Sequence, residues 1–364
     1  MLQSGTLTRY LATTYLLSFL LVLFSLLSVV YLFDTVELMR RASKFDDISL
    51  IVILQMSLLK LPEVGHIVLP FVVLLSGILT LWKLTKRYEL VVIRSAGLSI
   101  WQFLMPIASV AICVGVFHVV LINPIGSLFL GKFESLESTY LDRRKNVVTF
   151  SQQGLWLRQD NLEGRAILHA SRIDMPDWTL KNVMALFYDD DNSLIRRIDA
   201  EKANLQGGEW VFYNATINAK NTLPQQTDYI TLATDLRVDD IEDSFASPET
   251  ISFWKMPAFI QTLETTGFDA TGVRIHYQSL WSQPLLLFSM ILLAACVTMR
   301  SPRESGTVFL VVLGVALGFV VFFMSSFMQA LGASHQIPVF FAAWASPLIC
   351  CLLGLTTIMS LEDG

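Results

Sequence analysis

The sequence predicts an α-helical integral membrane protein with six transmembrane helices and a separate all-β domain outside the membrane. Its 364 residues are 53% hydrophobic with a mean hydropathy of +0.55, which is too apolar for a soluble chain with a single core. Six apolar stretches reach the length of about 20 residues that a helix needs to cross a bilayer. Between the third and fourth stretches the chain becomes polar and alternates in the manner of β-strands.

The six predicted spans carry charges only at their margins. They are residues 11–33, 65–82, 100–122, 280–298, 308–328 and 339–359. The first apolar run is longer than a signal-peptide core and lacks a small-residue cleavage site before Asp34, so we expect a retained helix. Residues 1–130 and 278–364 therefore form two groups of three spans each.

Residues 131–277 form the predicted β domain, which holds most of the acidic side chains. Alternation predicts strands at 147–150, 154–158, 166–169, 210–213 and 229–232. Gly207-Gly208 before Glu209 has the composition of a hairpin turn. Such short strands are typical of a sandwich, a jelly roll or an open barrel. A helical stretch at 251–266 then leads back to the fourth span.

The distribution of Lys and Arg in the short loops gives the orientation, because these residues are retained on the cytoplasmic side. With the amino terminus inside, the cytoplasmic loops hold Arg9, Lys83, Lys86, Arg87, Arg94, Arg300 and Arg303. The opposite loops hold Arg40, Arg41, Lys44 and Lys60. This excess favours cytoplasmic termini and a β domain on the far side of the membrane, out of reach of ATP.

No catalytic, cofactor-binding or metal-binding residue is predicted. A net charge of −5 argues against a nucleic-acid partner, and the four cysteines lie in apolar runs without metal or disulfide spacing. Residues 126–132 resemble a phosphate-binding loop, but Phe133 replaces its Ser or Thr and no strand precedes it. We find no hydrolase motif and no zinc-binding histidine spacing. Any ATP hydrolysis is therefore expected in another subunit.

His118 is the most unusual histidine, because it lies inside a predicted span. An ionisable group in a membrane is a functional candidate. A neutral, hydrogen-bonded histidine near the outer interface is the simpler interpretation, and we prefer it.

Arg40, Arg41 and Lys44 form a basic cluster just beyond the first span, where an anionic lipid headgroup would be attracted. The structural alternative is equally open. Glu37 can pair with Arg41 four residues on, and interfacial cations often serve only as anchors.

Residues 88–97 can form a short amphipathic helix that ends at Gly97 in the cytoplasmic loop after the second span. Such a helix either lies on the membrane surface or inserts into a groove on a cytoplasmic partner. The GxxxG run at 314–318 predicts close helix packing. The aromatic and methionine side chains of the last two spans either line an acyl-chain cavity or face lipid, and the candidates are Phe323, Met324, Phe327 and Phe340.

Two motifs give this chain a family resemblance. They are Glu89-Leu90-Val91-Val92-Ile93-Arg94-Ser95-Ala96-Gly97 and Gln152-Gln153-Gly154-Leu155-Trp156, supported by Ile337-Pro338. In these runs the chain resembles the LptF/LptG family of lipopolysaccharide export permeases. The resemblance implies six spans, a periplasmic β-jellyroll and a subunit that extracts lipopolysaccharide from the inner membrane and passes it to a jellyroll bridge.

The resemblance also implies partners and roles. The partners are a homologous permease (LptF), a cytoplasmic ATPase dimer (LptB) that uses the ATP, and a bitopic jellyroll protein (LptC). The coupling helix would be residues 86–98, with the ATPase-coupling residues Glu89, Leu90, Val91, Ile93 and Arg94. Arg40 and Arg41 match basic positions near the family's lipid cavity, whereas Asp34 and Glu63 stand where basic residues are expected. The alternative function is a membrane scaffold or signalling protein with a periplasmic partner.

Overall fold

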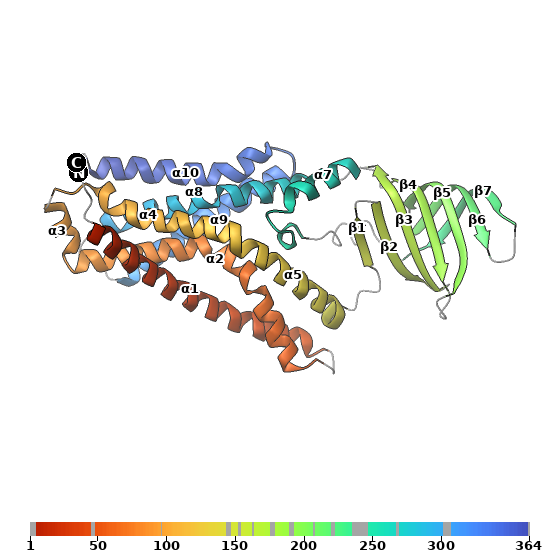
Figure 1. Ribbon diagram of the computed structural model, residues 1–364, viewed down its shortest axis with the longest axis horizontal. Helices are drawn as coiled ribbons and strands as arrows, with labels where there is room; N and C mark the ends of the chain where they lie inside the picture. Colours follow the sequence, from red (N-terminus) through yellow and green to blue (C-terminus); the bar gives the residue numbers. More distant parts are fainter. Residues whose placement is uncertain are drawn as a thin grey trace. The chain divides into compact units, whose positions relative to one another are not determined.

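The computed structural model describes residues 5–44, 48–95, 97–142, 147–151, 154–161, 164–174, 179–188, 193–206, 208–219, 223–234, 247–266, 269–300 and 307–362. The chain divides into two compact units (Figure 1). The membrane unit comprises Met1–Glu137, Pro248–Trp254 and Thr271–Gly364, and the sheet unit comprises Ser138–Ser247 and Lys255–Ala270. These borders differ from the predicted 131–277 by several residues, because the helices continue beyond the apolar windows.

Six helices of the membrane unit are long and apolar enough to cross a membrane, as the sequence predicted. They span Gly5–Ala42, Leu50–Lys86, Ile100–Leu141, Thr271–Met299, Phe309–Ala333 and Val339–Ser360. The helices themselves are α1 (Gly5–Ala42), α2 (Leu50–Lys86), α4 (Ile100–Phe117), α5 (Asn123–Glu137), α8 (Thr271–Arg300), α9 (Thr307–Ala333) and α10 (Val339–Glu362). The short α3 (Glu89–Ser95) follows α2, and Gly97 adopts φ +80° just beyond it, as expected of a helix terminator.

The third span is interrupted by a π-helical turn, His118–Ile122, between α4 and α5. Pro124, two residues after the turn, cannot donate a backbone hydrogen bond, and the widened turn lets the helix continue past it. This continuation carries the helix to Glu137, well beyond the predicted end at residue 122.

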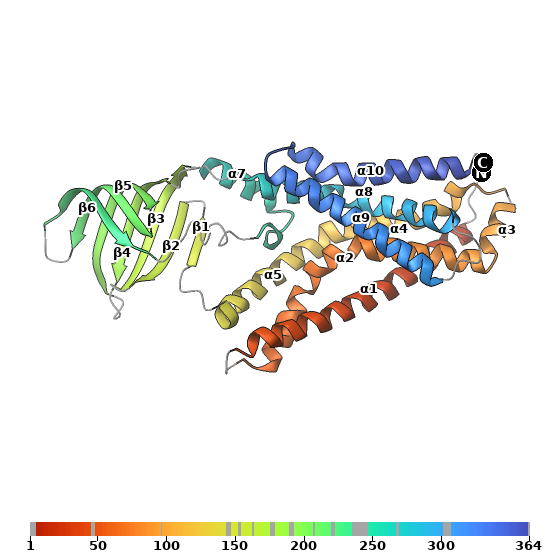
Figure 2. The same ribbon diagram turned by 180° about the vertical axis from the view of Figure 1, so that it is seen from behind.

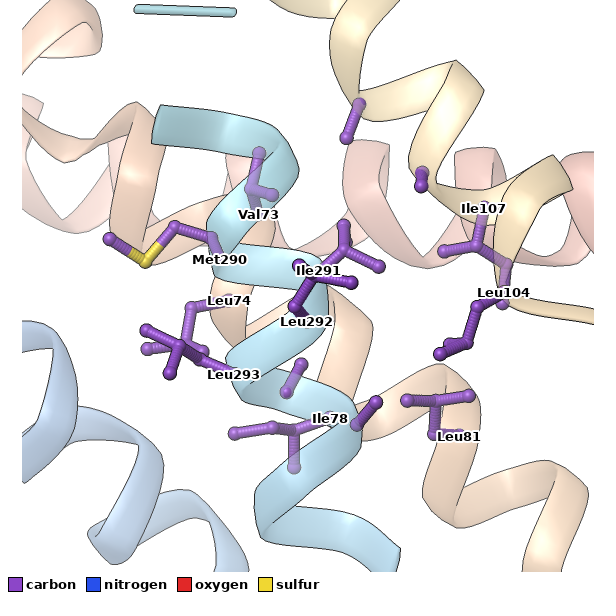
Figure 3. Close-up of a cluster of buried hydrophobic side chains, with 14 of the residues drawn as sticks. Val73, Leu74, Ile78, Leu81, Leu104, Ile107, Met290, Ile291, Leu292 and Leu293 are labelled. Carbon is purple, nitrogen blue, oxygen red and sulfur yellow. The ribbon is translucent and has the colours of Figure 1, made fainter. Parts of the chain in front are cut away.

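Helix α8 lies at the centre of the membrane unit. In the most apolar segment of α8, 67% of the residues are buried. The corresponding shares are 17% for α1 and 22% for α9. Met290, Ile291 and Leu292 of α8 pack among side chains of α2 and α4 (Figure 3). Figure 2 shows α1 and α9 running along the near side of this unit. Many of the apolar side chains of these two helices are exposed. This leaves two apolar surfaces for lipid or for another subunit.

The GxxxG run lets α9 approach α2 closely, as predicted. A Cβ atom at Gly314 would lie 2.5 Å from Ile78 Cδ1, and one at Gly318 would lie 2.7 Å from Phe71 Cδ1. Only glycine fits these positions without displacing a neighbour.

In its described residues the sheet unit contains seven antiparallel strands that pair in chain order, so the predicted all-β domain is confirmed and is a meander. The strands are β1 (Val147–Ser151), β2 (Gly154–Asn161), β3 (Gly164–Asp174), β4 (Thr179–Tyr188), β5 (Leu194–Gln206), β6 (Glu209–Ala219) and β7 (Gln225–Ala233). Two strands, β4 and β5, were not predicted. Asn182 at φ 49° interrupts the alternation of β4, and charged side chains mask that of β5.

The β5–β6 connection is the predicted hairpin. Gln206 pairs with Glu209, which leaves a two-residue loop, and Gly208 adopts φ +85°. One face of the sheet is apolar and buried, with Leu168, Ala185 and Ile198 side by side on β3, β4 and β5. The sheet unit therefore has an apolar interior formed by one sheet.

The predicted helix at 251–266 is shorter than expected. The structure has a 3₁₀ turn, Pro248–Thr250, and then α7, Met256–Thr266. Between them, the Phe253 amide donates to Asn123 Oδ1 at 2.8 Å, and Trp254 Nε1 donates to the Val120 carbonyl at 3.4 Å. These side-chain contacts with the third span hold residues 253 and 254 in a turn, so the helix begins only at Met256.

Candidate functional site

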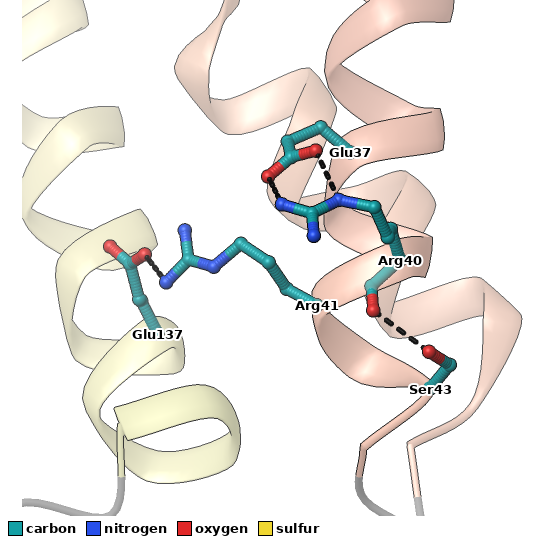
Figure 4. A network of polar contacts seen from close by, with 5 residues as sticks. All are labelled: Glu37, Arg40, Arg41, Ser43 and Glu137. Atoms are coloured by element: carbon teal, nitrogen blue, oxygen red, sulfur yellow. Dashed lines mark hydrogen bonds and ion pairs between the residues drawn. The ribbon is translucent and has the colours of Figure 1, made fainter.

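The basic cluster at the end of α1 makes two ion pairs (Figure 4). Arg40 donates two hydrogen bonds to Glu37, at 2.8 and 2.6 Å. Arg41 reaches Glu137 of α5 at 2.6 Å. The expected Glu37–Arg41 pair is therefore wrong, because a carboxylate on α5 takes Arg41 and leaves Glu37 to Arg40, three residues on.

These pairs change the charge of the cluster. Two of its three cations have a carboxylate partner, while Lys44 is exposed and has no ion pair among the described residues. The Arg40 pair is largely exposed to solvent, so water and salt weaken it. A phosphate group could therefore displace Glu37 from Arg40 more easily than Glu137 from Arg41.

Asp34, which stands where a basic residue was expected, pairs with Lys60 of α2 at 3.1 Å. The same ammonium group lies 5.5 Å from the centre of the Phe133 ring on α5. Thr35, the residue after Asp34, donates to the hydroxyl of Ser57 on α2 at 3.1 Å. Asp34 thus connects α1 to α2 and neutralises a cation rather than leaving it for a ligand.

Helix α3 presents two different faces. Leu90 and Ile93 pack against the core of the membrane unit, and Ile93 is buried. Val91 and Val92 point outward and are 43% and 65% exposed. Both faces of α3 therefore carry apolar side chains, and Val91 and Val92 form a small exposed patch together with Tyr88, which is 67% exposed.

The start of α3 is fixed by polar contacts. The Tyr10 hydroxyl on α1 donates to Glu89 Oε2 at 2.9 Å, and Arg87 lies 3.9 Å from the same carboxylate. Tyr88 holds φ 60°, an uncommon conformation for an aromatic residue, and it turns the chain sharply between α2 and α3. Of the five predicted coupling residues, the side chain of Arg94 lies outside the described residues.

Sequence reasoning missed Val92 and Tyr88 as outward residues of this segment. The helical spacing contained the signal, because Leu90 and Ile93 are three residues apart and share a face that excludes position 92.

The four candidate cavity residues occupy different environments. Phe323, Phe327 and Phe340 are 65%, 59% and 53% exposed, whereas Met324 packs against the core. Phe340 stacks on Trp344 with ring centres 5.7 Å apart. None of the four lines the cavity of about 240 Å³ in the membrane unit, which is bounded instead by Phe71 and Phe322 on its apolar side.

The histidine in the third span is hydrogen-bonded, as the sequence interpretation favoured. His118 Nδ1 lies 3.1 Å from Gln283 Oε1, and Gln283 Nε2 lies 3.1 Å from His66 Nδ1. The His66 and His118 rings stack at 5.1 Å, and His276 lies 6.2 Å from His66. Gln283 was not predicted, because nothing in the sequence connects residues 165 positions apart.

Residues 126–132 lie within α5, so their glycines form a helix rather than a phosphate-binding loop. Gln152 and Gln153 lie outside the described residues. Within the described ranges, no group of three or more His, Cys, Asp and Glu side chains could hold a metal ion.

Together, these features define a multi-pass membrane protein of six spans with an antiparallel β domain between the third and fourth. Helix α3, in the loop after α2, turns apolar side chains outward. The described residues contain no group of three or more side chains that could hold a metal ion. The chain belongs to the lipopolysaccharide export system permease family LptF/LptG, whose model matches residues 9–360.

Individual permease proteins are also similar to this chain. The chain is similar to the lipopolysaccharide export system permease protein LptG of Escherichia coli strain K12, with 24% identity over 365 residues that cover 98% of each chain. It is also similar to the protein of the same name from Haemophilus influenzae, with 22% identity over 80% of this chain and 81% of the relative. The predicted family and fold class are confirmed, and the chain is a lipopolysaccharide export permease.

Proposed function

We propose that this chain is the LptG-type permease subunit of an ABC exporter that extracts lipopolysaccharide from the bacterial inner membrane. The observation that carries this proposal is the similarity to LptG over 98% of both chains. The run at 152–156 leans toward the same branch of the family. In this assignment both termini are cytoplasmic and the sheet unit is periplasmic, which the excess of Lys and Arg in the inner loops supports.

The chain would work beside a homologous permease, LptF. The outward apolar faces of α1 and α9 support this arrangement, since they are the least buried spans. Exposed phenylalanines on α9, Phe323 and Phe327 among them, would then contact lipid or the acyl chains of the substrate. Arg40 and Lys44 would attract the phosphates of the headgroup from the end of α1.

The chain itself would bind no cofactor, and a cytoplasmic LptB dimer would hydrolyse the ATP. Helix α3 is the proposed docking element. Its outward residues, Val91 and Val92, would enter a groove on the ATPase. Ile93 packs against the same core as α2 and α4, so a displacement of α3 would be transmitted to the spans.

The substrate would next enter the sheet unit. Acyl chains need an apolar path once they leave the bilayer, and the buried face around Leu168, Ala185 and Ile198 supplies one. The jellyroll of a bitopic partner, LptC, would continue that path.

The test is reconstitution of the chain with LptF, LptB and LptC in liposomes that contain lipopolysaccharide, with ATP hydrolysis and lipopolysaccharide release measured together. We expect both activities only in the complete complex. Val92→Asp should reduce ATPase association and both activities, because it places a charge in the docking surface. The control is Leu223→Asp in the sheet unit, a leucine that is 86% exposed.

Normal lipopolysaccharide release without the ATPase would contradict the proposed energy source. Full association with LptB in the Val92→Asp variant would contradict the docking role of α3. Copurification with a periplasmic protein alone, without an ATPase or lipid, would favour a scaffold.

A further inference from the structure

The cavity of about 240 Å³ in the membrane unit has two chemically different walls. Phe71, Met290 and Phe322 form an apolar wall, and Glu63, Glu249 and His276 belong to a polar one. A cavity of this volume has room for a small polar group and a few methylenes.

The polar wall holds two carboxyl groups that have no ion-pair partner among the described residues. Within the described part of the chain, neither Glu63 nor Glu249 makes an ion pair or a hydrogen bond. Glu63 is repelled by Glu249, Glu134 and Asp34, and it is attracted only by Lys60. Lys60 is itself bound to Asp34 at 3.1 Å, and no Lys or Arg lines the cavity. Both residues are half-buried, and withdrawing a carboxylate from water costs free energy unless a cation or a proton compensates it.

His276 adds a hydrogen-bonding site to the same wall. Its Nε2 atom is shielded from solvent and has no hydrogen-bond partner among the described residues. The neighbouring His66 and His118 differ, because Gln283 bridges them. A buried polar atom without a protein partner is uncommon in native proteins and is available to accept a hydrogen bond from a water or a ligand.

A metal ion does not fit this wall, since no three metal-binding side chains of the described ranges gather closely enough. A primary ammonium group fits better. It has three N–H donors, and Glu63, Glu249 and His276 Nε2 are acceptors that line the same cavity. Its hydrogen bonds span about 2.7–2.9 Å, which suits a wider set of acceptors than the about 2.0–2.3 Å of metal–ligand bonds. The apolar wall of Phe71, Met290 and Phe322 suits the carbon atoms that carry such a group.

We propose that this cavity binds the primary ammonium group of an amphiphile. Glu63 and Glu249 supply the countercharge, His276 Nε2 accepts one hydrogen bond, and the first methylenes pack on Phe71 and Phe322. Glu63 lies within α2 and His276 lies in the second turn of α8, so both side chains belong to helices long enough to cross a membrane. The site does not depend on the proposed export function, because binding is measured without transport.

The first experiment compares octylammonium with octanol, which has the same chain length and no charge. The full chain in detergent micelles is melted with increasing concentrations of each compound. Octylammonium should raise the Tm of the wild type, since a ligand that binds only the folded state stabilises it. The Glu63→Gln/Glu249→Gln double variant should lose this shift, while the control Glu209→Gln, an exposed carboxylate on β6, should keep it.

Single variants keep the test decisive if the double variant does not fold. Glu63→Gln, Glu249→Gln and His276→Phe should each raise the half-maximal octylammonium concentration about tenfold, as expected for the loss of one hydrogen bond to a charged group. Equal stabilisation by octanol, or an undiminished shift in the variants, would overturn the proposal. A Tm that responds to pH but not to octylammonium would show that protons alone compensate the carboxylates.

A second experiment identifies the source of the ammonium group. The full chain is placed in nanodiscs of phosphatidylethanolamine or of phosphatidylcholine, whose trimethylated nitrogen has no N–H, and retained lipids are identified by native mass spectrometry. Retention of phosphatidylethanolamine by the wild type, with loss in the double variant, supports a membrane lipid as the ligand. Equal retention of phosphatidylcholine contradicts the proposed N–H recognition. Octylammonium binding without lipid retention supports the site and assigns it to an amine from another source.

Discussion

Replacing Gly318 by alanine is expected to destabilise the membrane unit, although alanine is the better helix former. The new Cβ would lie 2.7 Å from Phe71 Cδ1 and 2.8 Å from Cε1, closer than nonbonded carbon atoms approach. The Phe71 ring cannot move freely, because Phe319 and Phe322 lie 5.5 and 6.2 Å from it. Relieving the overlap therefore requires α9 to shift relative to α2.

The expected magnitude follows from comparison with a glycine that has space around it. Gly131 lies in α5, and a Cβ there would meet no atom within 4 Å. Gly131→Ala should stabilise the helix by about 1 kcal/mol through propensity alone. Gly318→Ala gains the same stabilisation from helix propensity, but the contact with Phe71 adds an overpacking cost of about 1–3 kcal/mol. The difference between the two variants should thus be about 1–3 kcal/mol, a factor of roughly 5 to 150 in the unfolding equilibrium.

The assay is thermal unfolding of the full chain in detergent, followed by tryptophan fluorescence. Gly318→Ala should melt below the wild type and Gly131→Ala at or above it. In a Phe71→Ala background, Gly318→Ala should no longer be destabilising, since the clashing ring is absent. The reasoning is refuted if Gly318→Ala melts together with Gly131→Ala, or if Phe71→Ala leaves its cost unchanged.

Three further predictions concern other parts of the chain. Arg41→Glu should lower the Tm, because it places two carboxylates next to each other. Adding Glu137→Arg should recover most of the loss, because it restores opposite charges between α1 and α5. A Tm that does not recover would contradict the ion pair. Ile93→Ala should destabilise the chain by about 2–5 kcal/mol, measured by thermal melting, because it removes a buried side chain from the core; an unchanged Tm would place Ile93 on the outward face of α3. Ala185→Trp should block photo-crosslinking of acyl chains to the buried face of the sheet, while Lys202→Trp at an exposed position should not; equal crosslinking in both variants would exclude that face as the lipid path.

The sequence was sufficient for features that depend on local pattern. All six spans follow from the length and continuity of apolar runs, because a bilayer forces each crossing segment to satisfy its own backbone. The Gly207-Gly208 pair predicts the β5–β6 turn, and Gly97 predicts the end of α3, since the positive φ of Gly208 and of Gly97 favours glycine. The family follows from motifs whose residue types appear in the sequence itself.

The tertiary structure decided every feature that depends on which elements meet. Arg41 pairs with Glu137 rather than with Glu37, because α5 brings a carboxylate to the end of α1. Asn123 holds Phe253 in a turn, so α7 begins later than its sequence predicts. His118 and Gln283 bond across 165 positions. Local propensity fixes only the elements themselves, whereas ion pairs, buried hydrogen bonds and the two walls of the cavity arise from helix packing, which a single sequence does not display.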